Sequence, residues 1–395
     1  MERKIRIAIV VSHPIQHFSP QYVSFAAHEG VEIKVFFASA LGLKPYHDQQ
    51  FNMTVSWNRL GLERFPHEFL NGDEVIQPSA NLDAPSLENS LKVYDPEVVI
   101  IYGYYQKLQR RALRWARKNK KIVAYISDTE TKQKRNSLKE LIKFPLIRNF
   151  FSKIDFALTV GDSNEEYYKK MGLSSSQLLR MHFPIDIDLY KKSFASRDLL
   201  RNEIRSKYRI GEGDFVASVV GKLVPWKNQQ DIIKAMHLLE GKGIYSHLFV
   251  IGSGETLKEC QDLANNLSKS KVHFTGFVDP EKLPAYYAAS DVYIHPAAVE
   301  PHSLAISEAI FMGCPVIISD TCGSYGPTDD VQEGRNGYVF PFGNIPKLAE
   351  NIEKLITNKD LREKLGTNSN AIAVKYQQQS HYGIINDLIA AVTHV

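Results

Sequence analysis

The feature that most constrains the fold is a regular alternation of short apolar runs with helical patterns along almost all of the 395 residues. Apolar runs of about four to eight residues between turn signals are typical of strands that are buried on both faces. Such runs occur at residues 5–11, 32–38, 98–102, 122–126, 156–160, 215–221, 247–251, 272–275, 292–295 and 315–319. Helical patterns lie between them, for example at 229–239, 255–268 and 281–289. This alternation predicts an α/β fold of parallel sheets covered by helices.

The length of the chain favours two domains, because each half is large enough to bury its own core. A charged and weakly patterned segment at 190–209 separates the two sets of predicted strands. We therefore expect one Rossmann-like domain over 1–195 and a second over 196–379, with an amphipathic helix at about 380–395 that packs back on the first. Ligands of open parallel sheets bind at the carboxyl ends of the strands, so the two domains would face each other across a cleft.

The composition is that of an ordinary soluble protein, with 44% hydrophobic and 23% charged residues. A formal charge of +4 is too small to argue for a nucleic-acid partner. The three cysteines are odd in number and lack metal-type spacing, which favours a reducing, cytoplasmic compartment. The first eleven residues are basic and then apolar, as in a signal peptide. However, residues 12–14 interrupt the apolar run, and no cleavage site follows. We therefore interpret this segment as a first buried strand. No apolar run approaches the roughly 18 residues of a membrane span.

Two carboxylates eight residues apart, Glu300 and Glu308, stand out in the second half. Pro301 disfavours helical geometry at Glu300, which predicts a loop there, and Ser303 is a good N-cap for a helix that follows. The apolar face of that helix would consist of Leu304, Ile306, Ala309 and Ile310. Free backbone N–H groups at a helix start bind anions. A carboxylate on each side of an anion site suits a nucleotide sugar; the alternative is two surface carboxylates stabilised by the helix dipole.

Several motifs of the second half occur in an order and spacing that together are specific, although each is weak alone. They lie at 221–227, 251–255, 274–278, 290–296, 299–308, 308–317 and 334–338, with looser matches at 155–161 and 183–190. On these motifs the chain resembles the retaining glycosyltransferases of the GT-B fold, in the large family numbered 4. The resemblance implies two Rossmann-like domains, transfer of a sugar from a nucleoside diphosphate with retention, and no bound metal or other cofactor.

The resemblance also implies roles for residues on the donor side. Glu300 matches the glutamate that contacts hydroxyls of the donor sugar, and Glu308 matches the one that holds the ribose diol. Lys227 matches the phosphate-binding lysine of the family. Lys222 falls where most members have arginine, so a point charge replaces a planar two-pronged contact. Phe277 lies in the motif at 274–278, on the donor side.

Other donor-side positions depart from the family or carry two interpretations. Backbone N–H groups around His302, Ser303 and Leu304 would meet the sugar and the diphosphate, although His302 and Ser303 add bulk where the family has Phe and Gly. Gly252 and Gly254 follow a predicted strand, where a Gly-x-Gly pattern is either a donor contact or only a tight turn.

The first half departs further from the family, so the acceptor site is harder to place. The usual glycine-rich first loop is replaced by residues 12–20, and the strand ending at Ile126 leads to Asp128 instead of a catalytic-site histidine. His13 and Asp128 are the candidates for the acceptor side. His13 and His17 have a four-residue spacing, but Pro14 argues against a helix that presents both, and no third ligand is apparent, so we expect no metal site.

The strongest charge feature is the stretch 107–153, which contains fifteen lysines and arginines against three acidic residues. Its segment 138–151 mixes apolar and basic residues. Such a surface either docks on an anionic membrane, where a lipid-linked acceptor would reside, or is a solvated face of a helix whose apolar side packs inward.

The sequence therefore favours a glycosyltransferase of bacterial surface polysaccharide or glycolipid biosynthesis, cytoplasmic and peripheral on the inner membrane face. Its catalytic residues would be Glu300, Lys227 and Lys222, with His13 and Asp128 on the acceptor side. Its partners would be a nucleotide-sugar donor and a glycan or lipid-linked acceptor. One alternative is a sugar-nucleotide epimerase or hydrolase of the same fold, and another is a non-catalytic nucleotide-sugar-binding subunit of a glycan assembly complex.

Overall fold

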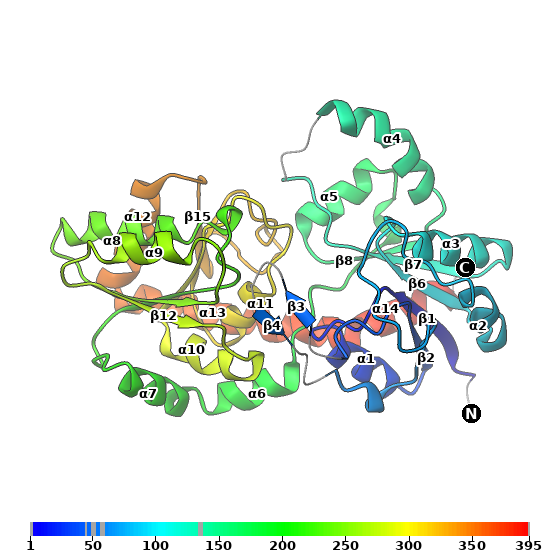
Figure 1. Cartoon of the computed structure of the whole chain (residues 1–395), viewed down its shortest axis with the longest axis horizontal. Coiled ribbons are helices and arrows are strands. Elements are labelled where there is room, and N and C mark those ends of the chain that lie inside the picture. The colour runs from blue at the N-terminus through cyan, green and yellow to red at the C-terminus, as the bar shows by residue number, and fades with distance from the viewer. Residues whose placement is uncertain (1–2, 44–45, 49–52, 56–59, 133–136, 394–395) are drawn as a thin grey trace.

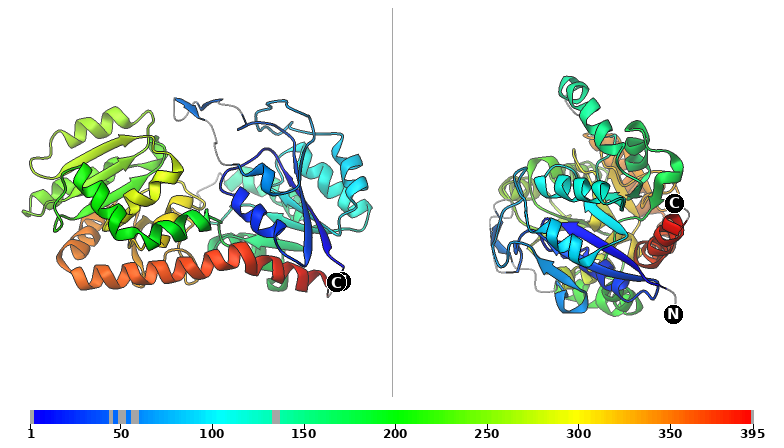
Figure 2. Two further views of the ribbon diagram at one scale, coloured as in Figure 1. Left: turned by 90° about the horizontal axis from the view of Figure 1, so that it is seen from below. Right: turned by 90° about the vertical axis from the view of Figure 1, so that its right-hand side faces the viewer.

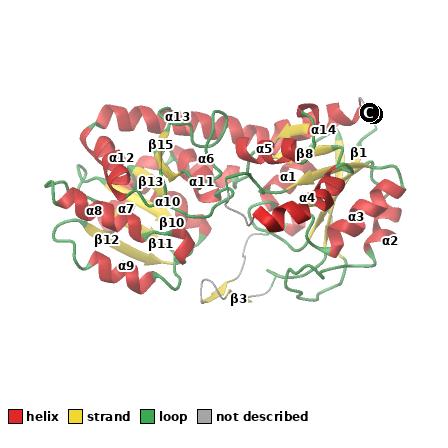
Figure 3. Ribbon diagram, turned by 90° about the horizontal axis from the view of Figure 1, so that it is seen from above, coloured by secondary structure: helices red, strands yellow, loops and turns green. Residues whose placement is uncertain are grey.

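The computed structural model describes residues 3–43, 46–48, 53–55, 60–132 and 137–393, and shows two parallel sheets side by side (Figure 1). Within these residues, the first sheet has seven strands in the order β5-β2-β1-β6-β7-β8-β9, and the second has six in the order β12-β11-β10-β13-β14-β15. The strand pairs of both sheets are parallel. Helices cover both faces of each sheet (Figure 3). The predicted α/β fold of two Rossmann-like domains is confirmed.

The first domain contains all the strands that the apolar runs of the first half predict. Its strands are β1 (Ile5–Val11), β2 (Val31–Phe37), β5 (His67–Phe69), β6 (Val98–Tyr102), β7 (Ile122–Ile126), β8 (Phe156–Thr159) and β9 (Leu178–Arg180), with a separate hairpin of β3 (Tyr46–Asp48) and β4 (Met53–Val55). Its helices are α1 (Ser19–Ala26), α2 (Leu87–Tyr94), α3 (Lys107–Lys118), α4 (Ser137–Phe151) and α5 (Asp162–Lys170). The edge strands β5 and β9 are three residues long and therefore too short for a periodicity to reveal them.

The second domain contains the five strands predicted for its half and a sixth, β15, that no apolar run predicted. Its strands are β10 (Val216–Val220), β11 (His247–Ile251), β12 (Lys271–Gly276), β13 (Val292–His295), β14 (Val316–Ser319) and β15 (Gly337–Phe340). Its helices are α6 (Ile187–Ala195), α7 (Arg197–Lys207), α8 (Gln230–Glu240), α9 (Leu257–Ala264), α10 (Leu283–Ala289), α11 (Leu304–Phe311) and α12 (Ile345–Thr357). Central strands such as β13 and β14 are buried along their whole length, which explains why their sequences are continuous apolar runs.

The chain crosses between the domains twice. The first crossing runs through 181–186 into α6, which packs with α7 against α10 of the second domain. The expected division between residues 195 and 196 therefore falls between α6 and α7, which both pack on the second domain. The second crossing is the long helix α13 (Lys359–Gln378), which continues through a π-helical turn at Gln379–Gly383 into α14 (Ile384–Thr393) and runs along both domains (Figure 2). Helix α14 packs Ile384 and Leu388 into the core of the first domain.

The two crossings are joined by buried hydrogen bonds from one side chain. Gln377, which is 1% exposed, accepts a bond from the Ile185 backbone N–H at 2.9 Å and donates to the Phe183 carbonyl at 2.8 Å. Ser380 adds a bond from its hydroxyl to the Met181 carbonyl at 2.7 Å. Because these bonds satisfy buried backbone groups of the linker, they fix the first crossing against the second.

A second contact joins the domains near the start of α5. The Asp162 backbone N–H donates to Asp329 Oδ2 at 2.9 Å, and the Thr328 backbone N–H donates to Asp162 Oδ2 at 2.8 Å. Arg180 Nη2 lies 2.7 Å from Asp162 Oδ1. Burial, and then the charge of Asp162, raises the pKa of Asp329 to about 7. A Cβ at Gly161 would clash with the Asp329 carboxylate, so this close approach requires glycine.

The basic stretch 107–153 spans α3, β7 and α4, and part of its charge is neutralised locally. Ion pairs of 2.6–2.9 Å join three of its cations to carboxylates of the first domain: Arg111 with Asp83, Arg117 with Asp155, and Lys121 with Asp95. Lys134 and Arg135 lie outside the described residues, as does the side chain of Lys139. Among the described helices, none is both long and apolar enough to cross a membrane.

Helix α4 stands out from the body of the first domain (Figures 1 and 2). Its Phe144 and Ile147 pack against the first-domain core, whereas Lys143, Leu146 and Arg148 are exposed. One side of this helix therefore packs inward, as one of the two interpretations predicted. The other side exposes both basic and apolar residues.

We predict that Gln377→Ala lowers the free energy of unfolding by about 2–4 kcal/mol, because two buried backbone groups lose their partner. The neighbouring exposed residue supplies a matched control, and Gln378→Ala should change the free energy by less than about 0.5 kcal/mol. Urea denaturation of the three proteins measures both values. Equal stability of the two variants would contradict the role given to Gln377.

Candidate active site

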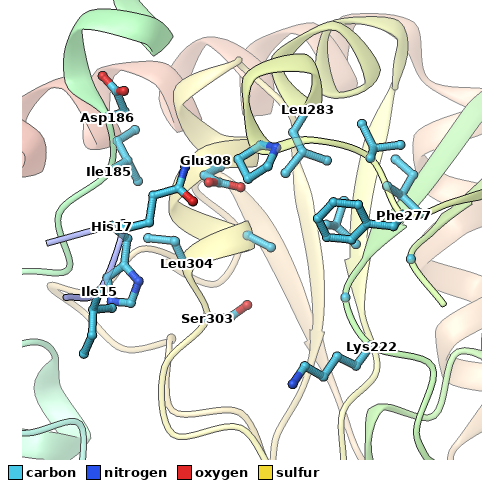
Figure 4. A pocket seen from close by; sticks show the side chains of 18 of the residues that line it. Ile15, His17, Ile185, Asp186, Lys222, Phe277, Leu283, Ser303, Leu304 and Glu308 are labelled. Atoms are coloured by element: carbon cyan, nitrogen blue, oxygen red, sulfur yellow. The ribbon is translucent and has the colours of Figure 1, made fainter. Parts of the chain in front are cut away.

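A cavity of about 620 Å³ lies between the two domains. The first domain contributes residues of the loop after β1, including His13 and His17. The second domain contributes the loops after β10, β11, β12 and β13 and the start of α11. In Figure 4, Lys222 and Ser303 lie toward the lower end of the cavity and Glu308 toward the upper end. Carboxyl ends of parallel strands thus surround one space, as the sequence predicts.

Glu300 lies on the loop after β13 and lines this cavity. Its carboxylate oxygen Oε2 forms an ion pair with the Lys227 ammonium and lies 3.0 Å from His295 Nε2. The Glu300 side chain is only 13% exposed. The predicted loop is therefore present, and the Glu300 carboxylate has one charged partner, Lys227, and one hydrogen-bonding partner, His295.

His295, the last residue of β13, is a site residue for which the sequence analysis named no role. It is 2% exposed, and its Nδ1 lies 3.2 Å from the Tyr293 hydroxyl. Burial lowers the pKa of His295 well below its usual value, and the Lys227 charge lowers it further. The neutral ring donates from Nε2 to Glu300 and accepts from Tyr293 at Nδ1. Two sequence signals were present: His295 ends a predicted strand five residues before Glu300, and it lies in the motif at 290–296.

Glu308 lies inside α11 and also lines the cavity. The Tyr287 hydroxyl donates to Glu308 Oε2 at 2.9 Å. Burial raises the pKa of Glu308 to about 7, and the hydroxyls of Tyr287 and the nearby Tyr190 oppose that shift. A tyrosine of α10 therefore holds this carboxyl in a buried setting.

Both predicted lysines come from the segment after β10 and line the cavity. Lys227 ends the short 3-10 helix Pro225–Lys227. Burial lowers the pKa of Lys227 to about 8; the nearby Cys322 opposes this shift and Lys222 adds to it. Two cations that face one cavity give it the charge needed to bind a diphosphate.

Helix α11 starts where it was expected, but its N-cap residue forms no capping hydrogen bond. Ser303 is the N-cap residue, yet its side chain makes no capping bond, and its backbone N–H donates to Ser324 Oγ at 3.0 Å. One N–H group that we expected to face the donor is therefore already used within the protein. Leu304, the first helical residue, lines the cavity together with Ser303 and His302.

His302 is buried where the two domains meet. Its ring stacks on Phe183 with centroids 5.0 Å apart, and its Nε2 lies 3.3 Å from Asp330 Oδ2. Burial would lower the pKa of His302, but the nearby Asp330 carboxylate raises it, together with the charges of Asp329 and Asp128. This histidine therefore links the second-domain wall of the cavity to the first crossing, a contact that its place in the sequence did not reveal.

The two glycines of the Gly-x-Gly pattern have a packing role. Gly252 and Gly254 have φ of 138° and 156°, and a Cβ at either would clash with the carbonyl of Gly221 or Leu223. They let the loops after β10 and β11 lie against each other. Gly252 also lines the cavity with Phe277, whereas Gly254 is not among the lining residues.

On the first-domain wall, His13 faces the cavity and Asp128 does not. His13 Nδ1 lies 2.8 Å from Ser12 Oγ, and burial lowers the pKa of His13 to about 4. His13 is therefore neutral at pH 7. Asp128 is exposed on the loop after β7 and is not a lining residue. Among the described residues, no three His, Cys, Asp or Glu side chains are grouped to hold a metal ion.

Comparison with known proteins points in the same direction as this geometry. Residues 201–371 match the family of glycosyl transferases group 1. Both glutamates and both lysines of the cavity lie within this matched segment of the second domain. The matching segment therefore supports the family to which the motifs pointed.

Two curated relatives are similar over this part of the chain. A GDP-mannose-dependent alpha-(1-6)-phosphatidylinositol monomannoside mannosyltransferase of Mycobacterium tuberculosis is 28% identical over 46% of this chain and 47% of its own length. The capsular polysaccharide biosynthesis glycosyltransferase CapM of Staphylococcus aureus is 30% identical over 44% of this chain and 46% of its own. The chain spans about half the length of these relatives.

The whole fold has a counterpart among solved structures. HepE of Anabaena, in complex with UDP and glucose, superposes with a TM-score of 0.67 at 16% identity and covers 99% of this chain and 100% of its own. The GT-B fold expected from the motifs is confirmed.

We predict that Glu308→Gln stabilises the protein at pH 8 and does so much less at pH 5. The raised pKa means that the folded state holds a proton on Glu308 between pH about 4.5 and 7 that the unfolded state has lost, so stability falls as the pH rises through this window. The amide removes this loss and should add about 2–3 kcal/mol at pH 8. Urea denaturation of the wild type and the variant at both pH values measures this difference in the free energy of unfolding. Glu259→Gln, exposed on α9, is the control, and an equal gain at both pH values would contradict the assignment.

Proposed function

We propose that this protein is a glycosyltransferase that moves a hexose from a nucleoside-diphosphate sugar to an acceptor hydroxyl with retention. One observation carries the proposal. Two lysines and two glutamates from the second domain line the same cavity as His13 from the first. Cations for a diphosphate and carboxylates for sugar hydroxyls thus face a separate wall on which an acceptor can lie.

The chemistry that this cavity would support is electrostatic. Negative charge develops on the leaving diphosphate, where Lys222 and Lys227 would stabilise it; a preorganised donor of this kind contributes about 3 kcal/mol. Glu300 would orient the sugar and offset its positive charge, and Glu308 would bind the ribose. We propose attack on the face that the diphosphate leaves, with the diphosphate taking the acceptor proton and no metal ion.

His13 would then act on the acceptor. Because its pKa is lowered to about 4, the ring is neutral at pH 7 and keeps a nitrogen that accepts a hydrogen bond. A neighbouring hydroxyl of the acceptor would donate to that nitrogen and so position the attacking hydroxyl, whose own proton goes to the diphosphate. Asp128, exposed and outside the cavity lining, would act on the acceptor only indirectly, through its charge near His302.

The proposed pathway is the synthesis of bacterial surface polysaccharide or glycolipid. The similarity of the second domain to a capsular polysaccharide enzyme and to a phosphatidylinositol mannoside enzyme supports it. The acceptor would be a glycan or a lipid-linked sugar, and the protein would work on the cytoplasmic side of the membrane. The three free, buried cysteines agree with a reducing compartment.

A nucleotide-release assay over UDP-, GDP-, ADP- and dTDP-sugars tests the activity. We expect release from one donor, reduced at least about a hundredfold in Glu300→Ala and in Lys227→Ala because the charge that binds the transition state is lost. Glu259→Ala and Lys258→Ala, both exposed on α9, are matched controls and should keep full activity.

Two other outcomes would favour the alternatives. An altered or hydrolysed sugar from the donor alone would indicate an epimerase or hydrolase. Donor binding without release, persisting when lipid-linked acceptors are added, would indicate a non-catalytic binding subunit.

We further propose that the exposed side of α4 docks on an anionic membrane. Lys143 and Arg148 are exposed there on either side of Leu146, which is 71% exposed. A basic residue near an anionic surface contributes about 1 kcal/mol, and an exposed leucine adds apolar contact.

Sedimentation with vesicles of phosphatidylcholine and about one-third phosphatidylglycerol tests this docking. The double variant Lys143→Glu/Arg148→Glu should reduce vesicle binding at least about tenfold, because two attractive charges become repulsive. The double variant Lys258→Glu/Lys282→Glu makes the same charge change on the second domain and should bind like the wild type. Equal loss in both variants would indicate a general charge effect and contradict docking through α4.

A further inference from the structure

The ion pair between Lys227 and Glu300 joins two groups to which the proposed reaction gives different tasks. The lysine would bind the diphosphate, and the glutamate would bind the sugar. Yet the Lys227 ammonium contacts Glu300 Oε2 directly, and both side chains are mostly buried, at 21% and 13% exposure. A diphosphate brought to this ammonium competes with the carboxylate, because both are anions and the space is shielded from water.

A second contact determines what happens to Glu300 if the lysine leaves. His295 Nε2 lies 3.0 Å from the same oxygen, Oε2. The ring belongs to β13, is 2% exposed, and is held at Nδ1 by the Tyr293 hydroxyl at 3.2 Å. Tyr293 also belongs to β13, which is an inner strand of the second sheet. The sheet therefore fixes the His295 ring, which donates to Glu300. The Lys227 ammonium, in contrast, lies at the end of a flexible side chain.

We infer that Lys227 exchanges partners when the donor binds, leaving Glu300 for the diphosphate, and that His295 is the positioning residue that keeps Glu300 aimed into the cavity after the exchange. The inference rests on the proposed function. No covalent step is involved, since one ion pair is replaced by another. A neutral imidazole suits the task because it holds the carboxylate by a hydrogen bond without cancelling its charge.

The exchange has a measurable consequence for nucleotide affinity. If the wild-type protein must break the Lys227–Glu300 pair to bind a diphosphate, its apparent affinity is reduced by that step. Glu300→Gln weakens the pair and should bind the nucleoside diphosphate about fivefold more tightly, although turnover is lost. A fixed structural pair predicts the opposite, since loss of its carboxylate would disturb Lys227 and weaken binding.

A double-mutant cycle separates the exchange from a general effect of removing a negative charge. Isothermal titration with UDP, GDP, ADP and dTDP identifies the diphosphate that binds, and its Kd is measured for wild type, Glu300→Gln, Lys227→Met and the double variant. We expect Glu300→Gln to tighten binding only when Lys227 is present. Equal tightening in the Lys227→Met background, or no tightening at all, would overturn the exchange.

The positioning role of His295 is tested by a split between binding and turnover. His295→Leu keeps an apolar side chain of similar size and removes the donor. It should lower kcat about a hundredfold through misplacement of Glu300, while the Kd of the nucleoside diphosphate changes less than about twofold. His295→Gln, whose amide nitrogen can donate from a similar place, should recover most of kcat. A merely structural role predicts that Kd, kcat and thermal stability deteriorate together and that glutamine does not restore kcat.

Failure of this inference is distinguishable from failure of the proposed function. A wild-type protein that neither binds a nucleoside diphosphate nor releases one from a sugar donor would overturn both. A wild-type protein that does both, together with a His295→Leu variant of unchanged kcat, would overturn only the role of His295.

Discussion

The cavity has one wall on each domain, so its shape depends on the hydrogen bonds that hold the two chain crossings together. Gln377 satisfies buried backbone groups at Phe183 and Ile185, and the start of α5 binds Asp329 of the other domain. These are short polar contacts that are buried or half-buried, and each lost partner would leave an unsatisfied group. They hold His13 opposite the lysines, and they place His302 against the linker residue Phe183.

Within the cavity, the sheets fix the charged groups and burial sets their chemistry. Glu308 lies in an apolar setting that raises its pKa to about 7, whereas His295 and His13 are kept neutral by burial. Lys227 is mostly shielded from water beside Glu300. Such an arrangement is unfavourable for the folded protein alone, since desolvated charges weaken stability. It is favourable for a ligand that brings both anionic phosphates and hydroxyl donors, because the charges are already in place.

The sequence predicted the parts of the fold that carry strong periodicity. Central strands such as β1, β10 and β13 appeared as apolar runs because both of their faces are largely buried. The edge strands β5 and β9 did not, since three residues give no pattern. Among the site residues, Glu300, Glu308, Lys222 and Lys227 were found because they lie in motifs, and they line one cavity. His295 also lies in a motif, but it was missed because a histidine at the end of a buried strand gives no sign of the partner that its ring reaches.

What the sequence determined by itself was the class of fold and the set of groups at the carboxyl ends of the second-domain strands. Both follow from local patterns, namely hydrophobic periodicity, turn residues and spacing within single motifs. Only the tertiary structure decided which of these groups meet. It paired Lys227 with Glu300, placed His295 behind that pair, used the Ser303 N–H on Ser324, and left Asp128 outside the cavity lining. These outcomes depend on contacts between segments far apart in the chain, and local sequence patterns do not encode such distances.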